Sequence, residues 1–282
     1  MAEILEERDV VFADAGERPL RLDLYRPPAP NGAAVLLVHG GGWSRGSKDM
    51  LAEHARALAG EGFVAMAQEY RLTGEAPFPA CLHDVKRAIR WAKSRAASLG
   101  FAADKLCLEG HSAGAHLVLL AAAAPADPRL DPPEGMDAVA GDVAAVAAIY
   151  PPVLFHLDGP RPSGALAARV LPGADASEAA ARLASPIEHV TAAMPPVMLL
   201  HGDADKVVPV SASRRFEEKV RAVGGEAELH IYAGLPHGFA SHPQLRPAMM
   251  SMIAAFFRRW AIAPERFETT PAASVLEPQP AG

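Results

Sequence analysis

The chain has 282 residues, of which 50% are hydrophobic and 21% are charged, and its formal net charge is −6. This composition can bury a large core, which excludes a disordered or collagen-like chain. Lysine and arginine are scattered along an acidic sequence, so we expect no nucleic-acid partner. No apolar run reaches the length of a membrane span, and the acidic start lacks the basic region of a signal peptide. We therefore expect no membrane partner and a cytoplasmic location.

The first two predicted strands, residues 10–13 and 20–25, carry apolar residues with a period of two and flank a turn. Residues 33–38 differ, because they are apolar at every position. Such a run is typical of a central strand that is covered on both faces in a parallel sheet. Similar runs occur at residues 63–67, 106–108, 143–150 and 197–200, and a last strand is predicted at 227–232.

Helices are predicted between these strands, because apolar residues recur there every three or four positions. The predicted helices cover residues 51–59, 81–97, 113–124, 211–223 and 249–260. The alternation of strands and helices predicts an α/β fold, with a mostly parallel central sheet and helices on both faces. We expect one domain over residues 1–263, with a small cap insertion at 153–190, and a disordered C-terminal tail at 264–282, which is rich in Pro and Ala.

The motif with the clearest chemistry is GHSAG at residues 110–114, which follows an apolar strand and opens a helix. A sharp strand-to-helix turn presents a serine hydroxyl at the carboxyl edge of the sheet, and flanking glycines permit the close approach of strand and helix. This context favours Ser112 as a nucleophile over a chance occurrence of the pentapeptide. The N–H of Ala113, at the helix N-terminus, points toward developing negative charge.

A second motif, HGGGW, occupies residues 39–43 directly after an apolar strand. Consecutive glycines leave backbone N–H groups exposed, so Gly41 and Gly42 are candidate donors to the oxygen that becomes negative when a carbonyl is attacked. A phosphate-binding loop is one alternative, but Lys48 follows Ser47 where that motif requires the reverse order. A plain turn is the other alternative.

Together, HGGGW and GHSAG resemble the α/β-hydrolase esterases of the hormone-sensitive-lipase and bacterial acyl-esterase type. The sequences LDLYRP at 22–27, EYRL at 69–72 and FPA at 78–80 also resemble that family, and the similarity covers roughly residues 10–260. The resemblance implies the α/β-hydrolase fold and a nucleophile, acid and histidine in that order along the chain.

The acid and the histidine are therefore sought downstream. The resemblance to the pattern H-G-x-x-D at residues 201–205 places the acid at Asp205, with Asp203 as the rival. The histidine is expected after the last strand, where His237 lies in LPHGF. His242 is a less favoured alternative, and His230 is expected to be a packing residue inside a strand.

Four residues are predicted to border the substrate: Trp43, His111, Val208 and Phe239. We expect the remaining histidines, His54 and His116 among them, to be ordinary surface or packing residues. The sequence contains neither an H-E-x-x-H motif nor paired-cysteine spacing, so no metal site is predicted, and Cys81 and Cys107 are expected to be reduced and buried.

The predicted function is a serine carboxylesterase that hydrolyses short-chain acyl or aryl esters through an acyl-enzyme on Ser112 and requires no cofactor. An arylformamidase or other amidase is the alternative, because related enzymes share the same motifs. An inactive hydrolase-like ligand receptor is a third possibility. The expected partner is a small-molecule ester, and the sequence leaves the presence of a homo-oligomer open.

Overall fold

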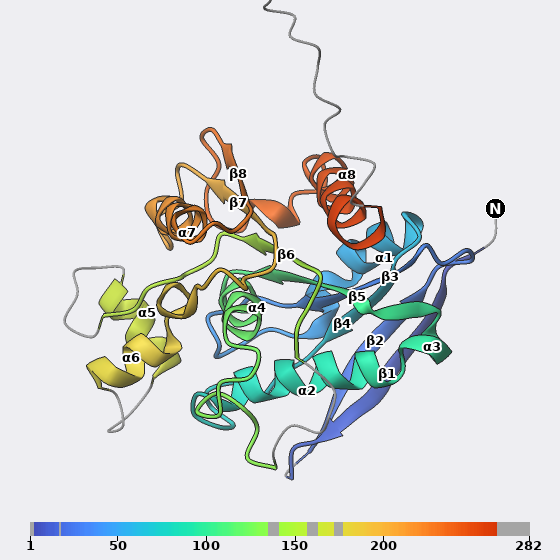
Figure 1. Cartoon of the computed structure of the whole chain (residues 1–282), viewed down its shortest axis with the longest axis horizontal. Helices are drawn as coiled ribbons and strands as arrows, with labels where there is room; N and C mark the ends of the chain where they lie inside the picture. The colour runs from blue at the N-terminus through green and yellow to red at the C-terminus, as the bar shows by residue number, and fades with distance from the viewer. Residues whose placement is uncertain (1–2, 17, 135–140, 157–162, 172–176, 264–282) are drawn as a thin grey trace, which may run out of the picture.

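The computed structural model describes residues 3–16, 18–134, 141–156, 163–171 and 177–263. These residues form an eight-stranded sheet in the order β1-β2-β4-β3-β5-β6-β7-β8 (Figure 1). β1 and β2 pair antiparallel, β2 and β4 do the same, and all other neighbours are parallel. The strands are β1 (Leu5–Asp14), β2 (Pro19–Arg26), β3 (Gly32–Val38), β4 (Val64–Gln68), β5 (Phe101–His111), β6 (Ala145–Ile149), β7 (Val197–Gly202) and β8 (Ala227–Tyr232).

Helices cover both faces of this sheet (Figure 1). They are α1 (Ala52–Gly60), α2 (Ala80–Ser94), α3 (Ala96–Leu99), α4 (Ala113–Ala123), α5 (Ser163–Val170), α6 (Glu178–Ala184), α7 (Ser211–Ala222) and α8 (Arg246–Phe257). Residues of α2, α4 and α7 pack in one core cluster, and residues of α1 and α8 pack in a second. The mostly parallel α/β sheet that the sequence predicted is confirmed.

The central strands are apolar throughout because they separate the two clusters. In β3, Leu36 belongs to the cluster with α2 and α4, whereas Val35 and Leu37 belong to the cluster with α1 and α8. Side chains alternate between the faces of a strand, so both faces of β3 must be apolar. Cys81 and Cys107 are free and buried, as predicted.

Several predicted elements have other bounds in the structure: the strand predicted at 106–108 is β5, Phe101–His111, and the helix predicted at 249–260 is α8, Arg246–Phe257. β1 begins at Leu5, five residues before the predicted strand, because its first half carries charges that pair at the sheet edge instead of alternating apolar residues. Glu6, for example, binds Arg56 with an O···N distance of 2.6 Å. The helix predicted at 81–97 ends at Ser94, and the short helix α3 follows it. Gly100 ends α3 in the left-handed conformation, with φ 89°.

The segment between β6 and β7 contains α5, α6 and the short 3-10 helix Pro186–His189. Ser177 caps α6 by accepting a hydrogen bond from the N–H of Ala180 at 3.1 Å. Phe155 and Leu166 from this segment are buried in the core cluster of α2, α4 and α7. The division into a domain of residues 1–263 and a cap at 153–190 stays a prediction, and the predicted tail lies outside the described residues.

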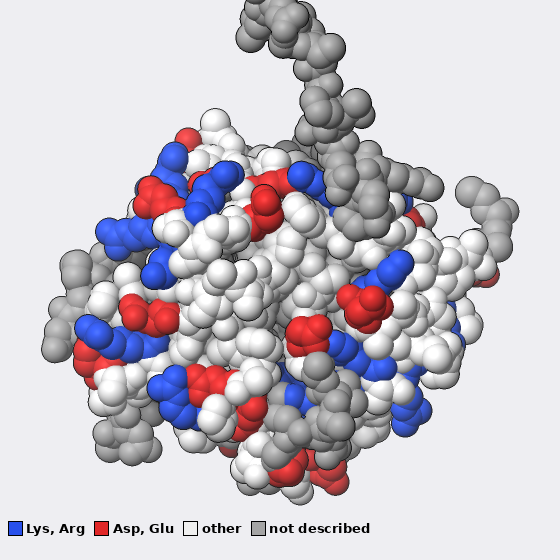
Figure 2. All heavy atoms as spheres, in the orientation of Figure 1, with Lys and Arg blue, Asp and Glu red and all other residues white. Residues whose placement is uncertain are grey.

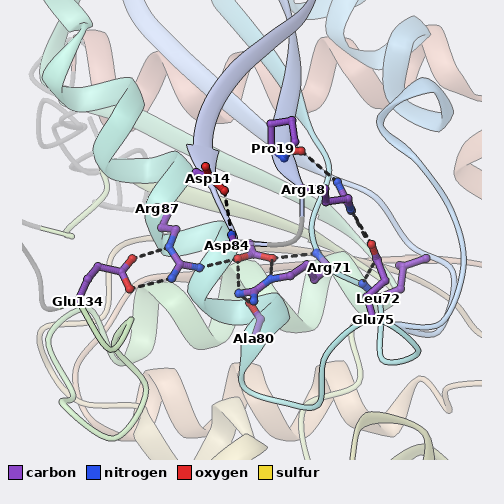
Figure 3. Close-up of polar contacts among 11 residues, drawn as sticks. Asp14, Arg18, Pro19, Arg71, Leu72, Glu75, Ala80, Asp84, Arg87 and Glu134 are labelled. Carbon is purple, nitrogen blue, oxygen red and sulfur yellow. Dashed lines mark hydrogen bonds and ion pairs between the residues drawn. The ribbon is translucent and has the colours of Figure 1, made fainter.

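An ion-pair network fixes the EYRL segment to α2 (Figure 3). Asp84 accepts hydrogen bonds from Nη2 and Nε of Arg71 at 2.8 and 2.9 Å. Nη1 of Arg87 donates to the same carboxylate at 2.7 Å. Arg87 also binds Glu134 at 2.6 Å. This network holds the segment that carries Tyr70 beside the sheet. No helix in the described parts of the chain is both long and apolar enough to cross a membrane.

Candidate active site

The candidate catalytic residues and the HGGGW motif, which begins at His39, all follow the carboxyl ends of parallel strands. His39 follows β3, Ser112 follows β5, Asp205 follows β7 and His237 follows β8. Because the carboxyl ends of parallel strands meet at one edge of a sheet, residues far apart in sequence converge there. Gly202, at the end of β7, permits this convergence, since a Cβ atom on it would lie 2.1 Å from the carbonyl oxygen of Leu235.

Ser112 lies on a strained turn between β5 and α4, with φ 52° and ψ −114°. This conformation is rare for a residue other than glycine and occurs at active sites, where the surrounding structure enforces it. A Cβ atom on Gly110 would lie 2.5 Å from the carbonyl oxygen of Gly114, and one on Gly114 would lie 2.0 Å from that of Val38. The GHSAG motif therefore needs both glycines to form this turn.

The structure brings Ser112, His237 and Asp205 together in one line of hydrogen bonds. Oγ of Ser112 lies 2.9 Å from Nε2 of His237, and Nδ1 of His237 lies 2.6 Å from Oδ2 of Asp205. A carboxylate only accepts hydrogen bonds, so Nδ1 carries the proton and Nε2 is free to accept from the serine hydroxyl.

Asp205 is buried and held ionised by several donors. Its Oδ1 accepts from the N–H groups of Val207 and Val208 at 2.8 and 2.9 Å, and Nε2 of His201 lies 3.3 Å from its Oδ2. Burial raises the pKa of Asp205, but the hydrogen bonds from His201, His237 and the Val208 N–H outweigh it and hold the pKa well below the usual range.

Asp203 occupies a different environment from Asp205. It is exposed, and its Oδ1 accepts a hydrogen bond from the N–H of Gly234 at 2.6 Å. This hydrogen bond connects the end of β7 to the turn after β8, so Asp203 stabilises the loop structure. The structure thus brings Asp205, and not Asp203, to His237.

The glycine loop at residues 40–42 lies against the Ser112 turn. A Cβ atom on Gly40 would lie 2.9 Å from the carbonyl oxygen of His111 and 3.4 Å from Cβ of Ser112. Gly41 and Gly42 adopt positive φ angles of 116° and 61°, a conformation that glycine tolerates at no steric cost. In the described residues, neither N–H donates to a protein acceptor, and the same is true of Ala113. All three predicted oxyanion donors are therefore available.

Ring stacking and hydrogen bonds of aromatic side chains fix the two ends of this loop, His39 and Trp43. The ring of Tyr70 stacks on His39 with centroids 4.3 Å apart, and its hydroxyl donates to the carbonyl oxygen of His39 at 3.1 Å. The indole N–H of Trp43 donates to Nδ1 of His116 at 3.0 Å, so Nε2 of His116 carries the proton that binds the carbonyl oxygen of Ala184 at 2.7 Å. His116 therefore links the loop to α6, in the segment between β6 and β7, a specific role that the sequence did not indicate.

A cavity of about 640 Å³ surrounds Ser112. Of the four residues predicted to border the substrate, Trp43 and His111 line this cavity, whereas Val208 and Phe239 are not among its lining residues. Val208 instead lines a second cavity of about 160 Å³, and the buried ring of Phe239 packs against Tyr150 and Tyr232. That these four residues border the substrate stays a prediction. The Ser112 cavity is lined by Gly40, Gly41, Gly42, Trp43, Arg45, Met50, Leu51, Glu53, His54, His111, Ser112, Tyr150, Leu166, Arg169, Val207, His237, Gly238, Ser241 and Arg246.

A buried polar network lies beside this cavity and was missed in the sequence. Oε1 of Glu109 lies 2.7 Å from Nδ1 of His54 and 3.0 Å from Nε2 of His111. The other nitrogen of His54 lies 3.3 Å from the carbonyl oxygen of Ala240. Burial raises the pKa of Glu109, but the charge of His54 and the hydrogen bonds from both histidines outweigh it and lower the pKa to about 2. The signal that could have indicated this network was an acidic residue directly after the apolar run at residues 106–108.

The same three side chains offer potential metal ligands within 4.8 Å of one another. Nδ1 of His54, however, faces an oxygen of the Glu109 carboxylate, which can only accept, so this nitrogen carries a proton in this arrangement. A metal ion would first have to displace the proton between His54 and Glu109. The prediction that the chain has no metal site stays a prediction.

The fold and this arrangement of residues define an α/β hydrolase, and comparisons with known proteins agree. The BD-FAE family model matches residues 22–220. The chain is 34% identical to Esterase LipC of Mycobacterium tuberculosis (strain ATCC 25618 / H37Rv), over 83% of this chain and 60% of LipC. It is 30% identical to the Probable carboxylic ester hydrolase LipM of the same strain, over 96% of this chain and 64% of LipM. The butyrate-bound structure of esterase Est2 from Thermogutta terrifontis superposes with a TM-score of 0.75 at 28% identity, covering 96% of both chains.

The chain therefore belongs to the BD-FAE family. The predicted resemblance to α/β-hydrolase esterases of the hormone-sensitive-lipase type is confirmed, and so is the predicted α/β-hydrolase fold. The chain spans about three fifths of the length of LipC and LipM.

Proposed function

We propose that the protein is a serine carboxylesterase that hydrolyses short-chain acyl or aryl esters through an acyl-enzyme on Ser112. One observation carries this proposal, namely the continuous line of hydrogen bonds from Oγ of Ser112 through His237 to Asp205, at 2.9 and 2.6 Å. The line opens into a cavity beside three available N–H donors, which is the arrangement that acyl transfer requires. The names of LipC, LipM and Est2, all esterases or ester hydrolases, support it.

In the first step, Oγ of Ser112 attacks the carbonyl carbon of the ester and its proton moves to Nε2 of His237. Asp205 holds the imidazole in the tautomer that can accept this proton and stabilises the imidazolium that results. The N–H groups of Gly41, Gly42 and Ala113 stabilise the negative oxygen of the tetrahedral intermediate. Removing one such donor typically costs about 3 kcal/mol of activation free energy.

In the second step, His237 gives its proton to the leaving alcohol, and the acyl group remains on Ser112. Water then attacks the acyl-enzyme, with His237 again as the base, and the carboxylic acid leaves. Every proton transfer uses His237, and no step requires a metal ion or an organic cofactor.

The proposed preference for short acyl groups rests on the size of the cavity and on the cap. The cavity walls include Trp43 and Leu166, which would contact an acyl chain a few carbons long. Est2 binds butyrate in the structure compared above, which supports an acid of similar length as the product here.

The test combines a rate measurement with covalent trapping. We expect the protein to hydrolyse para-nitrophenyl butyrate, and we expect Ser112→Ala to lower kcat/KM by roughly 10⁴-fold or more while the protein stays folded. A fluorophosphonate probe should modify Ser112, as located by peptide mass spectrometry. Modification of another serine, or an unmodified Ser112 in an active preparation, would contradict the proposed nucleophile. Faster turnover of N-formylkynurenine than of aryl esters would point to an arylformamidase, and a folded protein inert toward all of these reagents would indicate a ligand receptor.

A further inference from the structure

Positive charge is concentrated in the wall of the Ser112 cavity. Arg45, Arg169 and Arg246 line it, whereas Glu53 is its single acidic residue among the described lining residues. Glu53 is already paired, with Arg56 at 2.7 Å and Arg246 at 3.4 Å. Within the described residues, neither Arg45 nor Arg169 forms an ion pair or a side-chain hydrogen bond. Arg45 and Arg169 therefore have no anionic partner among the described residues.

Both arginines lie beside the loop that carries the proposed oxyanion donors. Nη1 of Arg169, which comes from α5 of the cap segment, lies 3.4 Å from the position that a Cβ atom on Gly42 would occupy. Cγ of Arg45 lies 3.3 Å from the corresponding position on Gly41. A substrate whose carbonyl oxygen faced the N–H groups of Gly41 and Gly42 would thus have the guanidinium of Arg169 a few ångströms away and the side chain of Arg45 beside it.

This local charge is unlike the rest of the molecule. The chain carries a net charge of −6. On the face shown in Figure 2, basic and acidic side chains lie interspersed. Many arginines elsewhere pair with nearby carboxylates, as Arg71 and Arg87 do with Asp84. Arginine binds carboxylates with a planar pair of N–H donors, and it stays charged at any physiological pH.

We propose that the preferred substrates are esters that carry a free carboxylate in addition to the ester group, held by Arg45 and Arg169. The proposal rests on the esterase function proposed above and narrows its substrate class. The carboxylate belongs either to the acid part of the ester or to the alcohol part, since both parts lie within the same cavity. In each case the two guanidinium groups attract the substrate and fix its orientation over Ser112.

The test compares charged esters with neutral esters of matched shape. For the acid part, the pair is the mono-para-nitrophenyl ester of adipate and para-nitrophenyl hexanoate. For the alcohol part, the pair is the acetate ester of para-hydroxybenzoate and the acetate ester of para-hydroxybenzamide. We expect kcat/KM to favour the charged member of at least one pair by roughly tenfold, because two partly exposed charge pairs contribute about that much. The preference should shrink between about 0.02 and about 0.5 M salt, because salt screens exposed charges.

Variants then assign the preference to the arginines. Arg169→Gln and Arg45→Gln should each lower the ratio of charged to neutral kcat/KM by roughly threefold, and Arg169→Lys should retain more of the ratio than Arg169→Gln. Arg215→Gln is the matched control, because Arg215 is an exposed arginine that lines the second cavity instead. Equal kcat/KM within both pairs, or a preference that survives in both Gln variants, would overturn the inference. Hydrolysis of the neutral esters would still support the esterase function, whereas failure to hydrolyse any of the four would contradict that function itself.

Discussion

Nδ1 of His54 lies 2.7 Å from Oε1 of Glu109, and both side chains are buried. The other ring nitrogen of His54 faces the carbonyl oxygen of Ala240, three residues after His237. Glu109 also accepts from His111, the residue directly before Ser112. The pair therefore connects α1 and β5 with the two segments that carry the proposed nucleophile and base.

We expect Glu109→Gln to lower the free energy of unfolding by about 3 kcal/mol. The neutral amide is a weaker acceptor than the buried Glu109 carboxylate for the hydrogen bonds from His54 and His111, and a buried hydrogen bond to a charged group typically contributes about 1.5 to 3 kcal/mol. The measurement is urea denaturation at neutral pH, together with a double-mutant cycle that includes His54→Gln. The double variant should lose less stability than the sum of the two single variants, because the residues contact each other.

Glu218→Gln serves as the control for Glu109→Gln, because Glu218 is exposed on α7 and its loss should change stability by less than about 0.5 kcal/mol. Additive effects of His54→Gln and Glu109→Gln would show that the two side chains do not form a pair.

Asp205 and Asp203 provide a matched comparison within one loop. Asp205→Asn should lower kcat by roughly 10³- to 10⁴-fold, because the amide cannot hold His237 in the required tautomer. Asp203→Asn should lower it less than about threefold, because the amide oxygen can still accept from the N–H of Gly234. The rates are measured with para-nitrophenyl butyrate on variants whose melting temperatures are compared. Similar losses in two equally stable variants would remove Asp205 from its proposed role.

Stability should fall as the pH is lowered from about 6.5 to about 4, and His116 should contribute to this loss. Burial lowers the pKa of His116 to about 4, whereas an exposed imidazole titrates near 6.5. In this range the unfolded chain binds a proton that the folded protein does not, so protons favour unfolding. The stabilisation is complete above pH 6.5 and is lost as the pH approaches 4. Between pH 7 and pH 5 the loss from one such histidine is roughly 2 kcal/mol.

The check is the free energy of unfolding of the wild type and of His116→Gln at both pH values. We expect the wild type to lose roughly 2 kcal/mol more than the variant over this interval. His242→Gln is the control, because His242 is exposed and its replacement should leave the pH dependence unchanged. A wild-type pH dependence in His116→Gln would mean that other groups account for the loss.

The sequence could predict the part of the site that is built from local motifs. Ser112 and the glycine loop are recognisable because strand, turn and helix lie within a few residues of each other. The pair of His54 and Glu109 is different, since 55 residues separate its members and no motif links them. Arg169 was missed for the same reason, because only the folding of α5 against the glycine loop brings it to the cavity. Sequence patterns identified residues whose chemistry depends on neighbours in the chain and missed those whose chemistry depends on the fold.

The preference for acyl length should depend on Leu166, which lines both the Ser112 cavity and the second cavity of about 160 Å³. Across para-nitrophenyl esters from acetate to palmitate, we expect kcat/KM to be highest at roughly two to six carbons, since each methylene contributes about 0.8 kcal/mol only while it is fully buried. Leu166→Ala should join the two cavities and move the maximum toward longer chains, because the second cavity has apolar walls that include Val153 and Leu154. The variant should also lose about 2 to 3 kcal/mol of stability, as is usual when a buried leucine is truncated.

Val220→Ala on α7 is the control, because Val220 is buried but lines neither cavity, so it should lower stability without moving the maximum. A wild-type maximum at about ten carbons or beyond would contradict the short-chain proposal, and an unchanged maximum in folded Leu166→Ala would show that Leu166 does not limit the acyl site.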